Sequence, residues 1–211
     1  MTSPTTRDQI SDHLLTPRNS APLVIDYQPV QGNSVRSMDG RLLVDNIVRV
    51  GRTAQVYGVP VIASTVNVKT GANKPTIPEL QAVLSGVQTL DRTTMSSWED
   101  EEFLAAVRAT GRRKLIMEAL WTEVCLTLPS LDALREGHEV YPVVDGVGGT
   151  STEAHRAGLE RICRRGGHPT SWVQLVCELQ RDWNRRETVK AFTEILFDPH
   201  APFLAAQQAQ G

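Results

Sequence analysis

The chain has 211 residues, of which 40% are hydrophobic and 22% charged, and it contains 15 glycines and 12 prolines. This ordinary globular composition excludes a disordered chain, a collagen-like repeat and a coiled coil. Lys and Arg number 22 against 24 Asp and Glu, a formal net charge of −2. Because no basic tract is present to neutralise phosphates, we expect no nucleic-acid partner.

The start of the chain, MTSPTTRDQISDHLL, lacks the positive leader and the apolar stretch of a signal peptide. No later apolar run has membrane-spanning length, so we expect a cytoplasmic protein without a membrane segment. The three cysteines, Cys125, Cys163 and Cys177, have no CxxC spacing. Their odd number and spacing favour neither a disulfide framework nor a cysteine zinc site.

Short apolar runs alternate with longer amphipathic segments along most of the chain. The runs, which predict strands, cover residues 22–26, 59–65, 87–92, 114–120 and 139–145, with a weaker sixth at 168–172. Helical spacing of apolar residues predicts helices over 42–57, 98–110, 122–137, 152–166 and 172–183. A glycine suited to a left-handed helix end follows most of them, at Gly58, Gly111, Gly137 and Gly166.

This alternation predicts an α/β protein with a mostly parallel, doubly wound sheet. No internal repeat or flexible linker marks a boundary inside it. We therefore predict one domain over residues 21–198, preceded by a lead-in at 1–20 and followed by a C-terminal arm at 199–211.

Polar residues that follow predicted strands are candidate site residues, because open parallel sheets bind ligands at the carboxyl ends of their strands. Asp26 ends the first strand, Arg92 ends the third, and Cys125 follows the fourth. Thr122 is a good helix-capping residue that would place Cys125 in a first helical turn. That position and a nearby Arg92 favour the nucleophilic thiolate. Asp26 is the candidate base for the thiol proton.

The same residues resemble a known family. The motifs are DYQ at residues 26–28, Arg92 before TTMSSWED, WTEVC around Cys125, and VVDGVGGTSTEAH at 143–155. They resemble the isochorismatase-like cysteine hydrolases, within them the YcaC-related branch of unassigned substrate, over residues 21–185. The resemblance implies a Rossmann-like three-layer α/β/α fold, a catalytic triad of Asp26, Arg92 and Cys125, and assembly into tetramers or octamers.

The resemblance also implies a cis peptide bond between Trp121 and Thr122. This bond would aim the N–H groups of Thr122 and Cys125 at a developing oxyanion. The oxyanion role competes with capping of the Cys125 N–H by the Thr122 hydroxyl, and we favour the oxyanion role.

The chain departs from the family in three places. The loop STVNVKTGANKP lacks the acidic residue and the histidines with which nicotinamidase-type members hold a metal, so we expect neither metal nor cofactor. Relatives usually have Lys at the position of Arg92, whose guanidinium cannot exchange its proton near neutral pH. Glu118 and Ala119 stand where relatives often have small residues.

Other residues have both a functional and a structural interpretation. Gln28 orients substrate or caps a loop, and we favour the substrate role. Trp98 and Trp121 wall a substrate pocket or fill the core. Cys163 and Cys177 lie in apolar helix stripes and are predicted to be buried. The five histidines show no metal-ligand pairing, and GxGG at 146–149 predicts a tight turn before a helix capped by Ser151 or Thr152.

The sequence thus predicts a hydrolase in which Cys125 attacks a small amide or related carbonyl compound and forms a covalent intermediate. Two alternatives stay open. One is hydrolysis of an isochorismate-like vinyl ether with Asp26 as proton donor, and the other is a binding or stress-associated protein that keeps the fold without catalysis. The arm around Phe203 and Leu204 is expected to reach a neighbouring subunit.

Overall fold

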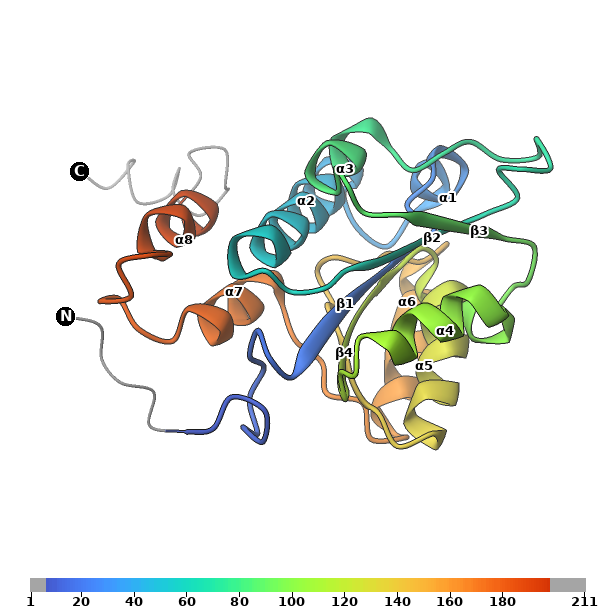
Figure 1. Cartoon of the computed structure of the whole chain (residues 1–211). Helices are drawn as coiled ribbons and strands as arrows, with labels where there is room; N and C mark the ends of the chain where they lie inside the picture. Colours follow the sequence, from blue (N-terminus) through green and yellow to red (C-terminus); the bar gives the residue numbers. More distant parts are fainter. Residues whose placement is uncertain (1–6, 198–211) are drawn as a thin grey trace.

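The computed structural model describes residues 7–197 and contains one parallel sheet of order β3-β2-β1-β4-β5 (Figure 1). Its strands are β1 (Ser20–Ile25), β2 (Ile62–Val66), β3 (Thr89–Arg92), β4 (Lys114–Ala119) and β5 (Glu139–Pro142). The chain winds outward from β1 to β3 and then returns to the other side of β1, which confirms the doubly wound sheet. The predicted sixth strand is wrong, because Thr170 forms only an isolated bridge with Val143.

Helices cover both faces of the sheet and complete a three-layer α/β/α sandwich (Figure 1). One layer contains α2 (Gly40–Tyr57), α3 (Pro78–Val83), α7 (Trp172–Gln180) and α8 (Val189–Leu196), and the other contains α4 (Glu101–Ala109), α5 (Thr127–Arg135) and α6 (Thr152–Cys163). The short α1 (Pro29–Ser34) follows β1. Between residues 7 and 197, no helix combines the length and the apolar character needed to cross a membrane.

Strand β4, which lies beside the central strand β1, contributes side chains to the cores on both faces of the sheet. One face packs toward α4, α5 and α6 through Leu115, Met117 and Ala119. The opposite face packs toward α2, α3, α7 and α8 through Ile116 and Leu120. Since successive side chains of a strand point to opposite faces, Glu118 shares the face of Ile116 and Leu120.

Two predicted helices are interrupted for local reasons. The segment 98–110 divides into a 3-10 turn η1 (Ser97–Glu99) and α4, because the extended Asp100 caps the N–H of Phe103. The segment 122–137 begins with a π-helical turn, η2 (Thr122–Leu126), before α5. Pro129 has no N–H to donate to the Cys125 carbonyl. In the turn before it, the Leu126 N–H donates to the Trp121 carbonyl, five residues earlier, which is the hydrogen bond of a π-helix.

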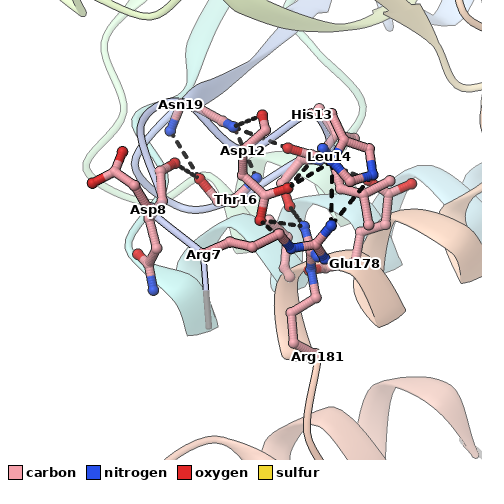
Figure 2. A network of polar contacts seen from close by, with 12 residues as sticks. Arg7, Asp8, Asp12, His13, Leu14, Thr16, Asn19, Glu178 and Arg181 are labelled. Carbon is pink, nitrogen blue, oxygen red and sulfur yellow. Dashed lines mark hydrogen bonds and ion pairs between the residues drawn. The ribbon is translucent and has the colours of Figure 1, made fainter. Parts of the chain in front are cut away.

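The described part of the predicted lead-in, residues 7–19, packs against the domain (Figure 2). Leu15 is fully buried, its N–H donates to Glu178, and its carbonyl accepts from Arg181. Asp12 lies between Arg7 and Arg181, 3.5 Å from each cation. This segment is therefore held by the body of the domain. The predicted arm at 199–211, with Phe203 and Leu204, lies outside the described residues.

Candidate active site

The three predicted site residues meet at the carboxyl edge of the sheet, between β1 and β4. Asp26 directly follows β1, Arg92 is the last residue of β3, and Cys125 lies in η2 beyond β4. Their exposed fractions are 0%, 3% and 7%. Because the strand order reverses between β1 and β4, this is the position where doubly wound sheets bind ligands.

Asp26 and Arg92 form a bidentate ion pair. Arg92 Nη1 donates to Asp26 Oδ1 and Nη2 donates to Oδ2, both at 2.7 Å. The same guanidinium donates to the Ser64 hydroxyl at 3.0 Å and to the carbonyls of Thr65 and Met95 at 3.2 and 3.3 Å. Arg92 therefore reaches across β2, and its fork fixes the orientation of the Asp26 carboxylate.

The backbone of Asp26 is left-handed, with φ 61°. Asp tolerates this region better than most residues, although it costs about 1–2 kcal/mol. The Asp26 N–H donates to the Ser64 carbonyl at 3.0 Å, and its carbonyl accepts from Gln28 N–H at 2.7 Å. Ser64 thus binds both the backbone of Asp26 and the side chain of Arg92. The sequence alone does not indicate this role, because the role depends on the pairing of β1 with β2.

The Cys125 thiol faces Asp26. Burial raises the pKa of Cys125, and the charge of Asp26 and its hydrogen bond to the thiol raise this pKa further. Arg92 and the Trp121 backbone lower the same pKa, but by less. In the free protein these contributions favour the neutral thiol, and the predicted thiolate stays a prediction. The arrangement holds a neutral thiol that can donate its proton to the carboxylate.

The predicted oxyanion geometry needs two corrections. The cis peptide bond joins Leu120 and Trp121, one residue earlier than predicted. The Thr122 N–H donates to the Gly148 carbonyl at 2.9 Å, so it is engaged within the protein. The Thr122 hydroxyl lies 2.8 Å from His155 Nδ1 and does not cap the turn. An oxyanion contact from the Cys125 N–H stays a prediction.

Gln28 holds a loop, and its predicted contact with substrate stays a prediction. Its side chain is fully buried, and Nε2 donates to the carbonyls of Val66 and Lys74 at 3.1 and 2.6 Å. Its Oε1 accepts from Val66 N–H at 2.9 Å. Both ends of the amide are therefore bonded to the end of β2 and the loop that follows it. These contacts agree with the structural interpretation of Gln28, in which it caps a loop.

The two tryptophans also make structural contacts. Trp121 Nε1 donates to the Gln31 carbonyl at 3.1 Å and to the Ser34 hydroxyl at 2.8 Å, which ties α1 to the start of η2. Trp98 is nearly buried, in the same apolar cluster as Cys125, and its Nε1 donates to Glu136 at 3.0 Å. Their predicted contacts with substrate stay predictions.

The two remaining cysteines lie closer to the surface than Cys125. Cys163 is half-buried and Cys177 exposed, so the prediction that both are buried is wrong. Within residues 7–197, no three His, Cys, Asp or Glu side chains are arranged to hold a metal ion. A site that works without metal or cofactor stays a prediction.

The fold and this edge of the sheet define a doubly wound α/β protein with an acid, a cation and a cysteine at its switch point. The chain belongs to the isochorismatase family, since the Isochorismatase domain model matches residues 20–174. It is an isochorismatase-family hydrolase.

Named relatives agree with this assignment. The chain is 31% identical over 189 residues to "Probable hydrolase YcaC" of Escherichia coli (strain K12), covering 89% of each chain. YcaC from Pseudomonas aeruginosa, solved with hexane-2,5-diol and covalent acrylamide, is similar with a TM-score of 0.83 and 28% identity, over 93% of this chain and 98% of that one. The Escherichia coli ycaC gene product, described as an octameric hydrolase of unknown specificity, has a TM-score of 0.83 and 27% identity over 100% of both chains.

Proposed function

We propose that the chain hydrolyses a small amide or related C–N bond, with Cys125 as nucleophile, Asp26 as base and Arg92 as the fixed cation. The thiol proton moves to Asp26 as sulfur bonds to the carbonyl carbon. Asp26 then returns this proton to the leaving nitrogen as the C–N bond breaks, which leaves a thioester. Water gives a proton to Asp26, attacks the thioester and releases the acid, and the proton returns to sulfur.

The position of Asp26 between Arg92 and Cys125 carries this proposal. The carboxylate accepts two hydrogen bonds from the guanidinium, and it lies close enough to the Cys125 thiol to raise the pKa of that thiol. A carboxylate that is held by Arg92 on one side and faces the thiol on the other suits a base that removes a proton from sulfur. The same geometry is less suited to the vinyl-ether alternative, in which Asp26 starts as the proton donor.

The proposal is tested by ammonia release from a panel of small primary amides. We expect Cys125→Ala to reduce the rate to background, and Asp26→Asn to reduce it by about 10²–10⁴-fold. The matched control is Cys177→Ala, because Cys177 is exposed on α7. Circular dichroism and thermal unfolding check that each variant is folded.

Other outcomes separate the alternatives. Turnover that survives Cys125→Ala but not Asp26→Asn overturns the nucleophile and favours vinyl-ether chemistry, which an isochorismate-like substrate then tests. Because one relative carries covalent acrylamide, acrylamide is a direct probe of thiol chemistry. An adduct at Cys125 found by mass spectrometry supports the proposal. No turnover and an adduct confined to Cys177 favour a binding protein.

The same proposal includes assembly into tetramers or octamers. Support comes from the octameric relative and from large apolar side chains left exposed, Met95 at 71% and Trp183 at 62%. Light scattering at micromolar concentration should give four or eight times the chain mass of 23.3 kDa. A monomer under these conditions contradicts this part of the proposal.

A further inference from the structure

The turn that carries Cys125 is held by α6 and by the loop that precedes it. The N–H of Thr122 donates to the Gly148 carbonyl at 2.9 Å. Glu123, the next residue of the turn, accepts from the N–H and hydroxyl of Thr150 at 3.0 and 2.6 Å. The predicted tight turn at 146–149 thus has a specific partner, the segment that bears the nucleophile.

Two glycines let these segments approach closely. A Cβ atom at Gly158 of α6 would lie 3.1 Å from the carbonyl oxygen of Thr122 and 3.1 Å from Glu123 Cα. A Cβ atom at Gly149 would lie 2.7 Å from Glu123 Oε2. The nucleophile turn therefore packs almost directly on the backbone of α6, and small shifts of α6 are passed to it.

His155 provides the buried polar contact between these segments. It lies in the first turn of α6, and its Nδ1 is 2.8 Å from the hydroxyl of Thr122, which is fully buried. Burial lowers the pKa of His155 and the nearby Glu123 opposes this shift, so the neutral imidazole dominates at neutral pH. The contact of Thr122 with His155 is partly buried, whereas the contact of Glu123 with Thr150 is exposed to solvent, so the first is the better shielded of the two.

We propose that His155 is a positioning residue for the cysteine chemistry. By holding the Thr122 hydroxyl, His155 fixes the first residue of the π-helical turn, and so sets the direction in which the Cys125 thiol points toward Asp26. The residue touches none of the reacting atoms and acts through Thr122. This inference rests on the proposed function, because it matters only where the direction of the thiol limits the reaction.

The test compares two substitutions at each end of the contact. His155→Leu and Thr122→Val remove it, whereas His155→Asn and Thr122→Ser keep a polar atom near the same place. The first readout is the rate of acrylamide addition to Cys125 as a function of pH, followed by mass spectrometry. The second is kcat and KM for the amide that the wild type hydrolyses fastest.

We expect His155→Leu and Thr122→Val each to lower kcat and the alkylation rate by about 10- to 100-fold, with a smaller change in KM. His155→Asn should restore most of the loss. Because both residues act through one contact, the double variant should be no slower than the single variants, within about twofold. Thr122→Val is nearly isosteric, so it keeps the test possible if His155→Leu fails to fold.

Three results overturn the inference. One is a wild-type rate in folded His155→Leu and Thr122→Val, and another is an equal loss in His155→Leu and His155→Asn. The third is a double variant in which the two losses multiply, which means that the residues act independently. Failure of the proposed function is seen separately, as full turnover in Cys125→Ala.

Discussion

Arg92 donates to both oxygens of Asp26 and to three further acceptors, so its charge is committed before any substrate arrives. Burial, first, and the charge of Asp26 raise the pKa of the Cys125 thiol by more than Arg92 lowers it. In the proposed mechanism the thiolate forms as the proton moves to Asp26. Arg92 orients the carboxylate that would accept this proton.

The fork of Arg92 gives a prediction for Arg92→Lys. A Lys ammonium is a point charge that cannot match both carboxylate oxygens, so one charge-assisted hydrogen bond is lost. We expect a loss of about 1.5–3 kcal/mol in the free energy of unfolding. Arg92→Met, which leaves the buried carboxylate unpaired, should cost about 3–5 kcal/mol. Urea denaturation measures both, and equal losses in the two variants contradict the role of the pair.

At the scale of elements, the sequence predicted those that a local pattern specifies. Apart from the sixth strand and the two interrupted helices, the predicted strands and amphipathic helices overlap the observed ones, and positive φ is found at the glycine ends Gly58, Gly111, Gly137 and Gly166. Ser151 caps α6, as one of the two candidates. The missed helices α1, α3 and α8 have six, six and eight residues, too short for a clear helical period.

The candidate site also has a part that the sequence predicts and a part that only the structure shows. The positions of Asp26, Arg92 and Cys125 after three strands predicted that they meet, because parallel strands end at one edge. The contacts of Ser64, Gln28 and His155 could not be read from the sequence, since each depends on strand register or on loop packing. One signal for the π-helical turn was present, in Pro129 four residues after Cys125.

The N-terminal segment in Figure 2 gives a prediction at the same scale. Asp12 accepts from Leu14 N–H at 3.0 Å and lies 3.5 Å from Arg181. Asp12→Ala should lower the free energy of unfolding by about 1–3 kcal/mol at pH 7, because the N–H loses its acceptor. Asp12→Asn keeps an acceptor and loses the two partly exposed ion pairs with Arg7 and Arg181, each worth about 0.2–1 kcal/mol.

The pH dependence of the Asp12 variants follows from the same contacts. Burial alone would raise the pKa of Asp12, but the Leu14 N–H and Arg181 outweigh it and lower this pKa below its ordinary value of 3.8. The stabilisation is therefore present above that pH and is lost as the pH falls through the lower value in the folded state. Denaturation curves should show the gap between wild type and Asp12→Asn closing at low pH, and a constant gap contradicts this account.

For the whole molecule, the sheet separates two environments. On one side, Cys125 belongs to the cluster formed with α4, α5 and α6. On the other side, Glu118 lies on the face of β4 that packs toward α2 and α7. Glu118 therefore lies on the far face of the sheet from Cys125, whereas the adjacent Ala119 faces the Cys125 side.

Glu118 is fully buried, and within residues 7–197 neither of its carboxyl oxygens has a hydrogen-bond partner. Burial raises the pKa of Glu118 well above its ordinary value of 4.5, and the charge of Asp145 raises it further. The folded state therefore keeps a proton that the unfolded chain releases near pH 4.5. Stability should fall as the pH rises from that value toward the raised pKa, because the folded state binds more protons.

Glu118→Gln removes this titration and should flatten the loss of stability with rising pH. At pH 8 we expect the variant to be more stable than the wild type by about 1–3 kcal/mol. The wild type must either keep a proton on the buried Glu118 carboxyl or bury its charge, whereas the variant has no carboxyl group at this position. Near pH 4 the two proteins should differ less. The matched control is Glu187→Gln, since Glu187 is exposed. Urea denaturation from pH 4 to 9 measures the effect, and a wild type that stays as stable as Glu118→Gln at alkaline pH means that Glu118 ionises without cost.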